Sequence, residues 1–191
     1  MFIHEPLILN RKGRTGAVRK IFLDDLCQLA RAAKGNIDCI YLHWSAGHYG
    51  QPFANYHINI DYDGSLLTSV ASLSVPLAHT WQRNYRSVGV AMLCCALATP
   101  HNLGNEPPTE LQIEAMAQVV AVLCRELELP VDFYHVRTHA EQADLDGYGP
   151  ATTWERWDLW ILRQGDPPGS GGHVIRGKAL WYLQRELKSM A

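Results

Sequence analysis

No run of apolar residues in this chain approaches the roughly 18 that a membrane-spanning helix needs, so membrane insertion is not expected. Positive and negative charges nearly balance, with a formal net charge of −2, which argues against binding nucleic acid or an anionic membrane by bulk charge. The first residues, Met1–Pro6, lack the basic start and apolar stretch of a signal peptide. We therefore expect synthesis in the cytoplasm, with any exit by another route, and no nucleic-acid partner.

Cysteine pairs with regular spacing are also missing. The five cysteines are an odd number, and no two of them form a CxxC pair. Each lies in an apolar helix-like or strand-like pattern, where a free cysteine behaves as a small hydrophobic residue. We therefore expect buried, reduced thiols at Cys27, Cys39, Cys94, Cys95 and Cys124.

What the chain does contain is enough apolar sequence for a substantial core. Its 191 residues are 47% hydrophobic and 19% charged, as in ordinary globular proteins. Neither a repeat nor a composition break suggests a second unit, so residues 1–191 are predicted to form a single domain.

The clearest strand is the run of β-branched, aromatic and aliphatic residues over 38–45. It predicts a buried strand of a central sheet, with His43 near its end, where catalytic or metal-binding groups are often carried. An Asp63-Gly64 turn signal indicates a hairpin between two further strands. The other strand patterns cover residues 53–61, 65–70, 87–95 and 134–138.

Helical apolar spacing occurs over residues 18–34, from Thr109 as far as Pro130, and over 174–187. Thr109 and Gln112 form a capping box, and the buried face of that helix is predicted to begin at Leu111. Residues 140–150 are expected to be loop, and residues 165–172 a connector. This order predicts an α/β fold with a central mixed β-sheet flanked by helices, on which the N-terminal and C-terminal helices dock.

Histidines are the main candidates for a functional site. His4, His48, His101 and His173 lie in Pro- or Gly-rich segments typical of surface loops. Five others lie in or next to predicted strands: His43, His57, His79, His135 and His139. A single strand histidine is more often a hydrogen-bonded core group, but several on one sheet face favour a metal, because catalytic zinc sites take three protein ligands from His, Cys, Asp or Glu.

Six short motifs follow one another between residues 37 and 162. They are Leu42-His43-Trp44-Ser45-Ala46, Tyr56-His57 followed by Asp63-Gly64, Leu77-Ala78-His79-Thr80, Asn84-Tyr85-Arg86-Ser87-Val88-Gly89-Val90, the helix opened by Thr109 and Gln112, and Thr138-His139-Ala140-Glu141. In this order they resemble the motifs of zinc-dependent N-acetylmuramoyl-L-alanine amidases of type 2, which are related to phage amidases and peptidoglycan recognition proteins. The resemblance implies the fold of that family and one Zn²⁺. It also implies hydrolysis of the amide bond between N-acetylmuramic acid and L-alanine in peptidoglycan or muropeptides.

The resemblance assigns His43 and His139 as zinc ligands, but the third ligand departs from the family pattern. The family carries an Asp or Cys in a Lys-x-Asp-Pro-Gly-like run shortly after the second histidine. Asp144 and Asp146 come too early for that run, whereas Asp158 comes 19 residues after His139. An insertion through residues 147–150 would account for the longer spacing, and Arg156 keeps a cation two residues before the carboxylate. Asp158 is therefore preferred, with Asp146 and Asp144 as alternatives.

The same resemblance suggests the other site residues. Tyr56 matches a catalytic tyrosine, and Arg156 lies where many members have a lysine that stabilises the oxyanion. Some members use a Glu in the strand that corresponds to residues 87–93, but this chain has Ala91, which leaves Tyr56 to orient or deprotonate the attacking water. His79 and Asn84 would line the groove that holds the peptide stem or the lactyl group.

Two other functions fit parts of the sequence. One is a binding module of the same fold that recognises muramyl peptide without turnover, which loss of the third ligand would indicate. The other is a different metallohydrolase built on His135 and His139, whose i, i+4 spacing would suit a helix. The apolar pattern there is not helical, and no Glu follows His135 directly. A lytic enzyme released at phage lysis and a cytoplasmic recycling amidase both remain open.

Overall fold

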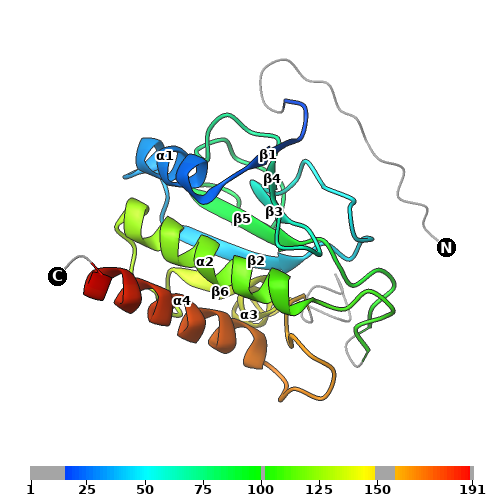
Figure 1. Cartoon of the computed structure of the whole chain (residues 1–191). Coiled ribbons are helices and arrows are strands. Elements are labelled where there is room, and N and C mark those ends of the chain that lie inside the picture. Colours follow the sequence, from blue (N-terminus) through cyan, green and yellow to red (C-terminus); the bar gives the residue numbers. More distant parts are fainter. Residues whose placement is uncertain (1–15, 100–101, 149–157, 190–191) are drawn as a thin grey trace.

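The computed structural model of the chain describes residues 16–99, 102–148 and 158–189 (Figure 1). Within these residues, six strands form one mixed sheet in the order β1-β4-β3-β5-β2-β6. The strands are β1 (Arg19–Ile21), β2 (Cys39–Trp44), β3 (Ile58–Ile60), β4 (Leu66–Thr68), β5 (Ser87–Met92) and β6 (Val136–Thr138). The helices are α1 (Leu23–Ala33), α2 (Glu110–Leu127), α3 (His139–Leu145) and α4 (Ser170–Ser189). The predicted α/β fold with a mixed sheet flanked by helices is confirmed.

The interior strand β2 positions the site. It is hydrogen-bonded in parallel to β5 on one side and to β6 on the other, and every residue after Cys39 is buried. β3 pairs in parallel with β5 and antiparallel with β4, so the hairpin predicted around Asp63-Gly64 is confirmed. Because β2, β5 and β6 run the same way, the residues at their carboxyl ends meet at one edge of the sheet.

Three helices pack side by side on one face, with α2 lying between α1 and α4 (Figure 1). The N-terminus of α2 is capped as predicted, since the Thr109 hydroxyl accepts from the Gln112 N–H at 3.0 Å. The predicted start of the buried face was wrong, because Leu111 is 60% exposed. Gln112 is buried instead, and its Nε2 donates to the backbone oxygens of Ile60 and Leu93, both at 3.0 Å. These two bonds turn the helix so that Gln112, and not Leu111, faces the sheet.

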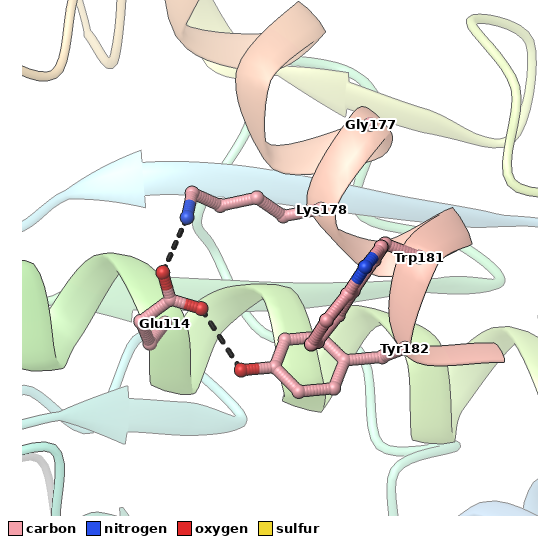
Figure 2. A pocket seen from close by; sticks show the side chains of 5 residues that line it. All are labelled: Glu114, Gly177, Lys178, Trp181 and Tyr182. Atoms are coloured by element: carbon pink, nitrogen blue, oxygen red, sulfur yellow. Dashed lines mark hydrogen bonds and ion pairs between the residues drawn. The ribbon is translucent and has the colours of Figure 1, made fainter. Parts of the chain in front are cut away.

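α4 is fixed to α2 by polar contacts as well as by packing. The Glu114 carboxylate of α2 forms an ion pair with Lys178 and accepts from the Tyr182 hydroxyl at 2.9 Å (Figure 2). Trp181 flanks these groups and is half-exposed, while Gly177 leaves the adjoining surface open. This network lies on the helical face of the molecule.

Several segments differ from the sequence-based expectation. The helix predicted from residue 18 begins at Leu23, because residues 19–21 pair with β4 as an edge strand and the Phe22 N–H donates to the Asp25 carboxylate at 2.9 Å. The loop predicted over residues 140–150 contains α3, whose seven residues are too few to show helical periodicity. α4 begins at Ser170, so the last residues of the predicted connector are helical.

The cysteines are all free, and three of them, Cys94, Cys95 and Cys124, are buried as expected. Cys27 and Cys39 are only partly buried. None of the described helices could cross a membrane, since each is too short or too polar for a span.

Candidate metal centre

Three potential metal donors converge at the carboxyl end of β2. The Nδ1 atom of His43 lies 2.9 Å from Asp158 Oδ2, and the Nδ1 atom of His139 lies 3.0 Å from the same oxygen. One donor atom from each residue lies within 4.8 Å of the other two. His43 and His139 are buried, and Asp158 is largely so. Among the described residues, this group brings together the three ligands predicted from the sequence.

Sheet register explains why the two histidines meet. Leu42 of β2 lies opposite Thr138 of β6, so His43 and His139 follow at the same level on neighbouring strands. Their ring centroids are 4.9 Å apart. His139 was expected at a strand end, and it is the residue directly after β6, where α3 begins.

Asp158 is held by backbone contacts with both of these elements. Its Oδ1 accepts from the Trp44 N–H of β2 at 2.6 Å, and its carbonyl oxygen accepts from the Ala140 N–H of α3 at 3.0 Å. Burial raises the pKa of Asp158, but the charge of His43 and the hydrogen bonds from His139 and His43 outweigh burial, so the pKa lies below its usual value. The carboxylate is therefore ionised at neutral pH.

The three residues fit a zinc ion. Two imidazole nitrogens and one carboxylate oxygen form a donor set typical of catalytic zinc sites, which leave the fourth position to water or substrate. Zinc ligands at about 2.0–2.1 Å in a tetrahedron lie about 3.3 Å from one another. The nitrogen–oxygen distances of 2.9 and 3.0 Å are close to that spacing.

Each imidazole also has a hydroxyl group beside its second nitrogen. His43 Nε2 lies 3.4 Å from Thr80 Oγ1, and His139 Nε2 lies 3.3 Å from Tyr148 Oη. Such outer partners fix the tautomer and the orientation of a ligating ring. Thr80 belongs to a motif noted in the sequence, but its contact with His43 depends on the fold. Tyr148 was missed, because it lies in a segment expected to be loop.

Tyr56 lies beside His43, with ring centroids 5.0 Å apart. Its turn is held by Asn59, whose side-chain oxygen accepts from the Phe53 N–H at 3.0 Å and whose amide donates to the Phe53 carbonyl at 3.1 Å. Ala91 lies opposite both His43 and Asn59 in the sheet. No carboxylate can therefore approach His43 from this position of β5.

His79, which is buried, and Asn84, which is partly buried, support the site from one turn. The His79 ring is 5.4 Å from that of His43, and a Cβ on Gly89 would approach it to 2.6 Å. Burial, followed by the neighbouring imidazoles, lowers the pKa of His79, which is therefore neutral. The Asn84 side-chain oxygen accepts from the N–H groups of His79 and Thr80 at 3.0 and 2.8 Å. Asn84 thus shapes the turn, and a direct role in binding substrate stays a prediction.

The alternative donors lie elsewhere. Asp146 accepts from Arg83 Nε at 3.0 Å and from Gln142 at 2.8 Å, and Asp144 lies exposed on α3. His135 precedes β6 and pairs with Asp132 at 2.7 Å, so it does not share a helix with His139. Arg156, the predicted oxyanion-stabilising residue, lies outside the described residues.

Comparison with known proteins gives a family match. The family model described as N-acetylmuramoyl-L-alanine amidase matches residues 32–154 of this chain, well over half of its length. Asp158 lies just beyond the matched residues. Among curated proteins, none matches the chain.

Solved structures show weaker likenesses. The endolysin amidase LysCS from Clostridium intestinale is 15% identical, with 75% of this chain and 83% of that chain covered and a TM-score of 0.47. The amidase LysC from the same organism is 16% identical, with 75% and 85% covered and a TM-score of 0.48. Drosophila peptidoglycan recognition protein LB is 15% identical, with 90% and 89% covered and a TM-score of 0.44. Because these identities and TM-scores are low, the family assignment rests on the match over residues 32–154 alone.

Proposed function

Because the chain belongs to the N-acetylmuramoyl-L-alanine amidase family, we propose that it is a zinc-dependent hydrolase of peptidoglycan or muropeptides. It would cleave the amide bond between N-acetylmuramic acid and L-alanine, with residues 1–191 forming one amidase domain. The observation that carries this proposal is the approach of His43 and His139 to the same oxygen of Asp158. A complete donor set favours turnover over the alternative of a binding module, which has no need of a third ligand.

His43, His139 and Asp158 would hold the Zn²⁺. When bound, the ion supplies Lewis-acid polarisation of the scissile carbonyl and activation of a water. Thr80 and Tyr148 would keep both imidazoles turned toward the ion, since their hydroxyls lie beside the opposite ring nitrogens.

Tyr56 would orient the attacking water or take its proton. Its ring lies next to His43, and Asn59 holds the turn that carries it. Because Ala91 occupies the position beside His43 on β5, no carboxylate there competes for this role.

Arg156 would stabilise the oxyanion of the tetrahedral intermediate. Arg156 stands two residues before Asp158 in the sequence, which is where the family pattern has a cation. A guanidinium stays protonated, and its contribution is therefore electrostatic rather than that of a general acid. His79 and Asn84 would border the groove for the peptide stem or the lactyl group.

The test combines metal content with product analysis. We expect one zinc per chain by elemental analysis after zinc reconstitution, and release of L-alanine-containing stem peptide from purified muropeptides by mass spectrometry. Zinc binding and muropeptide binding without product would favour the binding module. Absence of bound zinc after reconstitution would refute the proposed mechanism.

A further inference from the structure

We infer that Arg176 of α4 is a positioning residue for the metal centre, acting through Glu141 on the first turn of α3. This inference rests on the proposed zinc site. Two donors of that site, His139 and Asp158, come from segments that the first turns of α4 contact. The third donor, His43, belongs to an interior strand of the sheet and needs no such support.

α4 and α3 are joined by a bidentate ion pair. Arg176 Nη1 and Nη2 each donate to one oxygen of the Glu141 carboxylate, both at 2.8 Å. The two side chains are only 12% and 10% exposed. Arg176 Nη1 also donates to the Val136 carbonyl of β6 at 2.9 Å. Arg176 therefore ties together the strand before His139 and the helical turn after it, and a bidentate pair of this kind is strong and directional.

Glu141 passes this constraint to His139. Its Oε2 accepts from the Thr138 N–H at 2.8 Å, while the Thr138 hydroxyl accepts from the Glu141 N–H at 3.0 Å. The capping box so formed spans the backbone of His139 from both sides. Since Arg176 fixes the Glu141 carboxylate, its loss would loosen the turn that places the His139 ring.

The start of α4 also supports the segment that carries Asp158. The Gly171 N–H donates to the Trp160 carbonyl at 3.1 Å, and a Cβ on Gly171 would lie 2.4 Å from the Leu159 carbonyl oxygen. α4 and this segment are therefore in close backbone contact. The positions of His139 and Asp158 therefore both depend on how α4 packs against these segments.

Two glycines of α4 provide a test variant and a control variant that leave every charge unchanged. A Cβ on Gly172 would lie 2.6 and 2.7 Å from the two Glu141 carboxylate oxygens and 2.8 Å from Arg176 Nη1. These atoms are the ends of flexible side chains, so Gly172→Ala should displace the pair rather than the helix. A Cβ on Gly177 would meet nothing within 4 Å, which makes Gly177→Ala the matched control.

The experiment measures Zn²⁺ affinity of the metal-free full chain by competition with a chromophoric chelator. We expect Arg176→Met and Gly172→Ala to weaken Zn²⁺ binding by about tenfold or more, as is typical when a partner behind a metal ligand is lost. Arg176→Lys should recover part of the affinity, because it keeps the charge but not the bidentate contact. Lys178→Met breaks a different ion pair of α4, to Glu114 on α2, and is the control for loss of docking (Figure 2).

The outcomes separate this inference from the proposed function. Wild-type affinity in both Arg176→Met and Gly172→Ala would overturn the role of Arg176 and leave the zinc site intact. Equal weakening by Lys178→Met and Gly177→Ala would also overturn it, because the effect would then reflect α4 as a whole. If Arg176→Met does not fold, Gly172→Ala decides. A wild-type chain that binds no zinc would refute the proposed function itself.

Discussion

His43 is completely buried, yet both of its ring nitrogens face polar atoms. Nδ1 faces the Asp158 carboxylate, and Nε2 faces the Thr80 hydroxyl. Burying an imidazole without such partners would be costly, because its polar nitrogens would lose their hydrogen bonds to water. The same arrangement leaves Nδ1 as the atom that a metal ion would engage, with Thr80 holding the ring from behind.

Tyr56→Phe tests the proposed role of the tyrosine hydroxyl. The substitution removes only the hydroxyl of a ring that lies beside His43, so folding and zinc binding should persist. Turnover of muropeptide should fall by about 10²–10⁴-fold, the usual contribution of positioned acid–base catalysis. Steady-state kinetics on zinc-loaded protein measure this, with the exposed Tyr62→Phe as control. Unchanged turnover in Tyr56→Phe would assign the residue to packing against Phe53 and His43.

Asp158→Asn and Asp146→Asn test the identity of the third ligand. Asn keeps an oxygen for the Trp44 N–H but removes the charge that both imidazoles face. We expect Asp158→Asn to lower zinc affinity by more than the roughly 10–100-fold typical of outer partners. Asp146→Asn alters the contacts with Arg83 and Gln142, which are not among the three donors, and should bind zinc as the wild type does. Chelator competition compares the two, and the reverse result would show that Asp158 is not a ligand.

At the scale of elements, the carboxyl ends of β2 and β6 bring the histidines together, and short helix α3 continues from β6 without a loop. A helix of seven residues has little stability of its own, so its capping box and its ion pair with α4 matter more than helix propensity. The orientation of His139 is therefore a property of three elements, β6, α3 and α4.

Two N-caps of matched geometry separate a general loss of stability from a specific effect on the site. Thr138 caps α3 and Thr109 caps α2, and each hydroxyl accepts from a backbone N–H at 3.0 Å. Replacing either threonine by alanine should lower the free energy of unfolding by about 1 kcal/mol. Only Thr138→Ala should also weaken zinc binding, because only α3 carries His139. Urea unfolding and chelator competition on both variants check this, and equal zinc affinity would contradict it.

At the scale of the whole molecule, the buried histidines make stability depend on pH. Burial lowers the pKa of His57 to about 4, despite the opposing hydrogen bond to the Val75 carbonyl. The ring nitrogens are used in the neutral form, with Nε2 donating to Val75 at 2.8 Å and Nδ1 accepting from the Gly89 N–H at 3.0 Å. In the unfolded chain His57 protonates near pH 6.5. The unfolded chain therefore binds more protons than the folded chain between about pH 4 and 6.5.

Stability should therefore fall as the pH is lowered through this window. His57 alone should account for about 2 kcal/mol between pH 7 and pH 4.5. Urea unfolding of the metal-free protein at the two pH values measures the change, and His57→Gln should show a smaller difference than the wild type. An equal difference in both proteins would mean that His57 has the same pKa in the folded and unfolded states.

Much of the fold could be predicted because its signals are local. The buried run that forms β2, the Asp63-Gly64 hairpin and the Thr109–Gln112 capping box each depend on residues a few positions apart. The ordered motifs around His43 and His139 likewise pointed to the amidase family, which the match over residues 32–154 confirms.

Local patterns failed where a distant contact overrides them. Edge pairing with β4 makes residues 19–21 a strand, and two bonds from Gln112 to the sheet set the rotation of α2. α3 was missed although Thr138 and Glu141 have the spacing of a capping box, because a helix this short has no apolar period to detect.

The sequence by itself determined the sheet, its main helices, the family and the two histidines, since each depends on neighbouring residues or on a motif. Only the tertiary structure decided which carboxylate meets those histidines and which side chains stand behind them. Asp158 reaches His43 across 115 positions of the chain, and Arg176 reaches Glu141 across 35. Contacts between residues this far apart in the sequence are fixed by the packing of whole helices and strands, which no short stretch of sequence specifies.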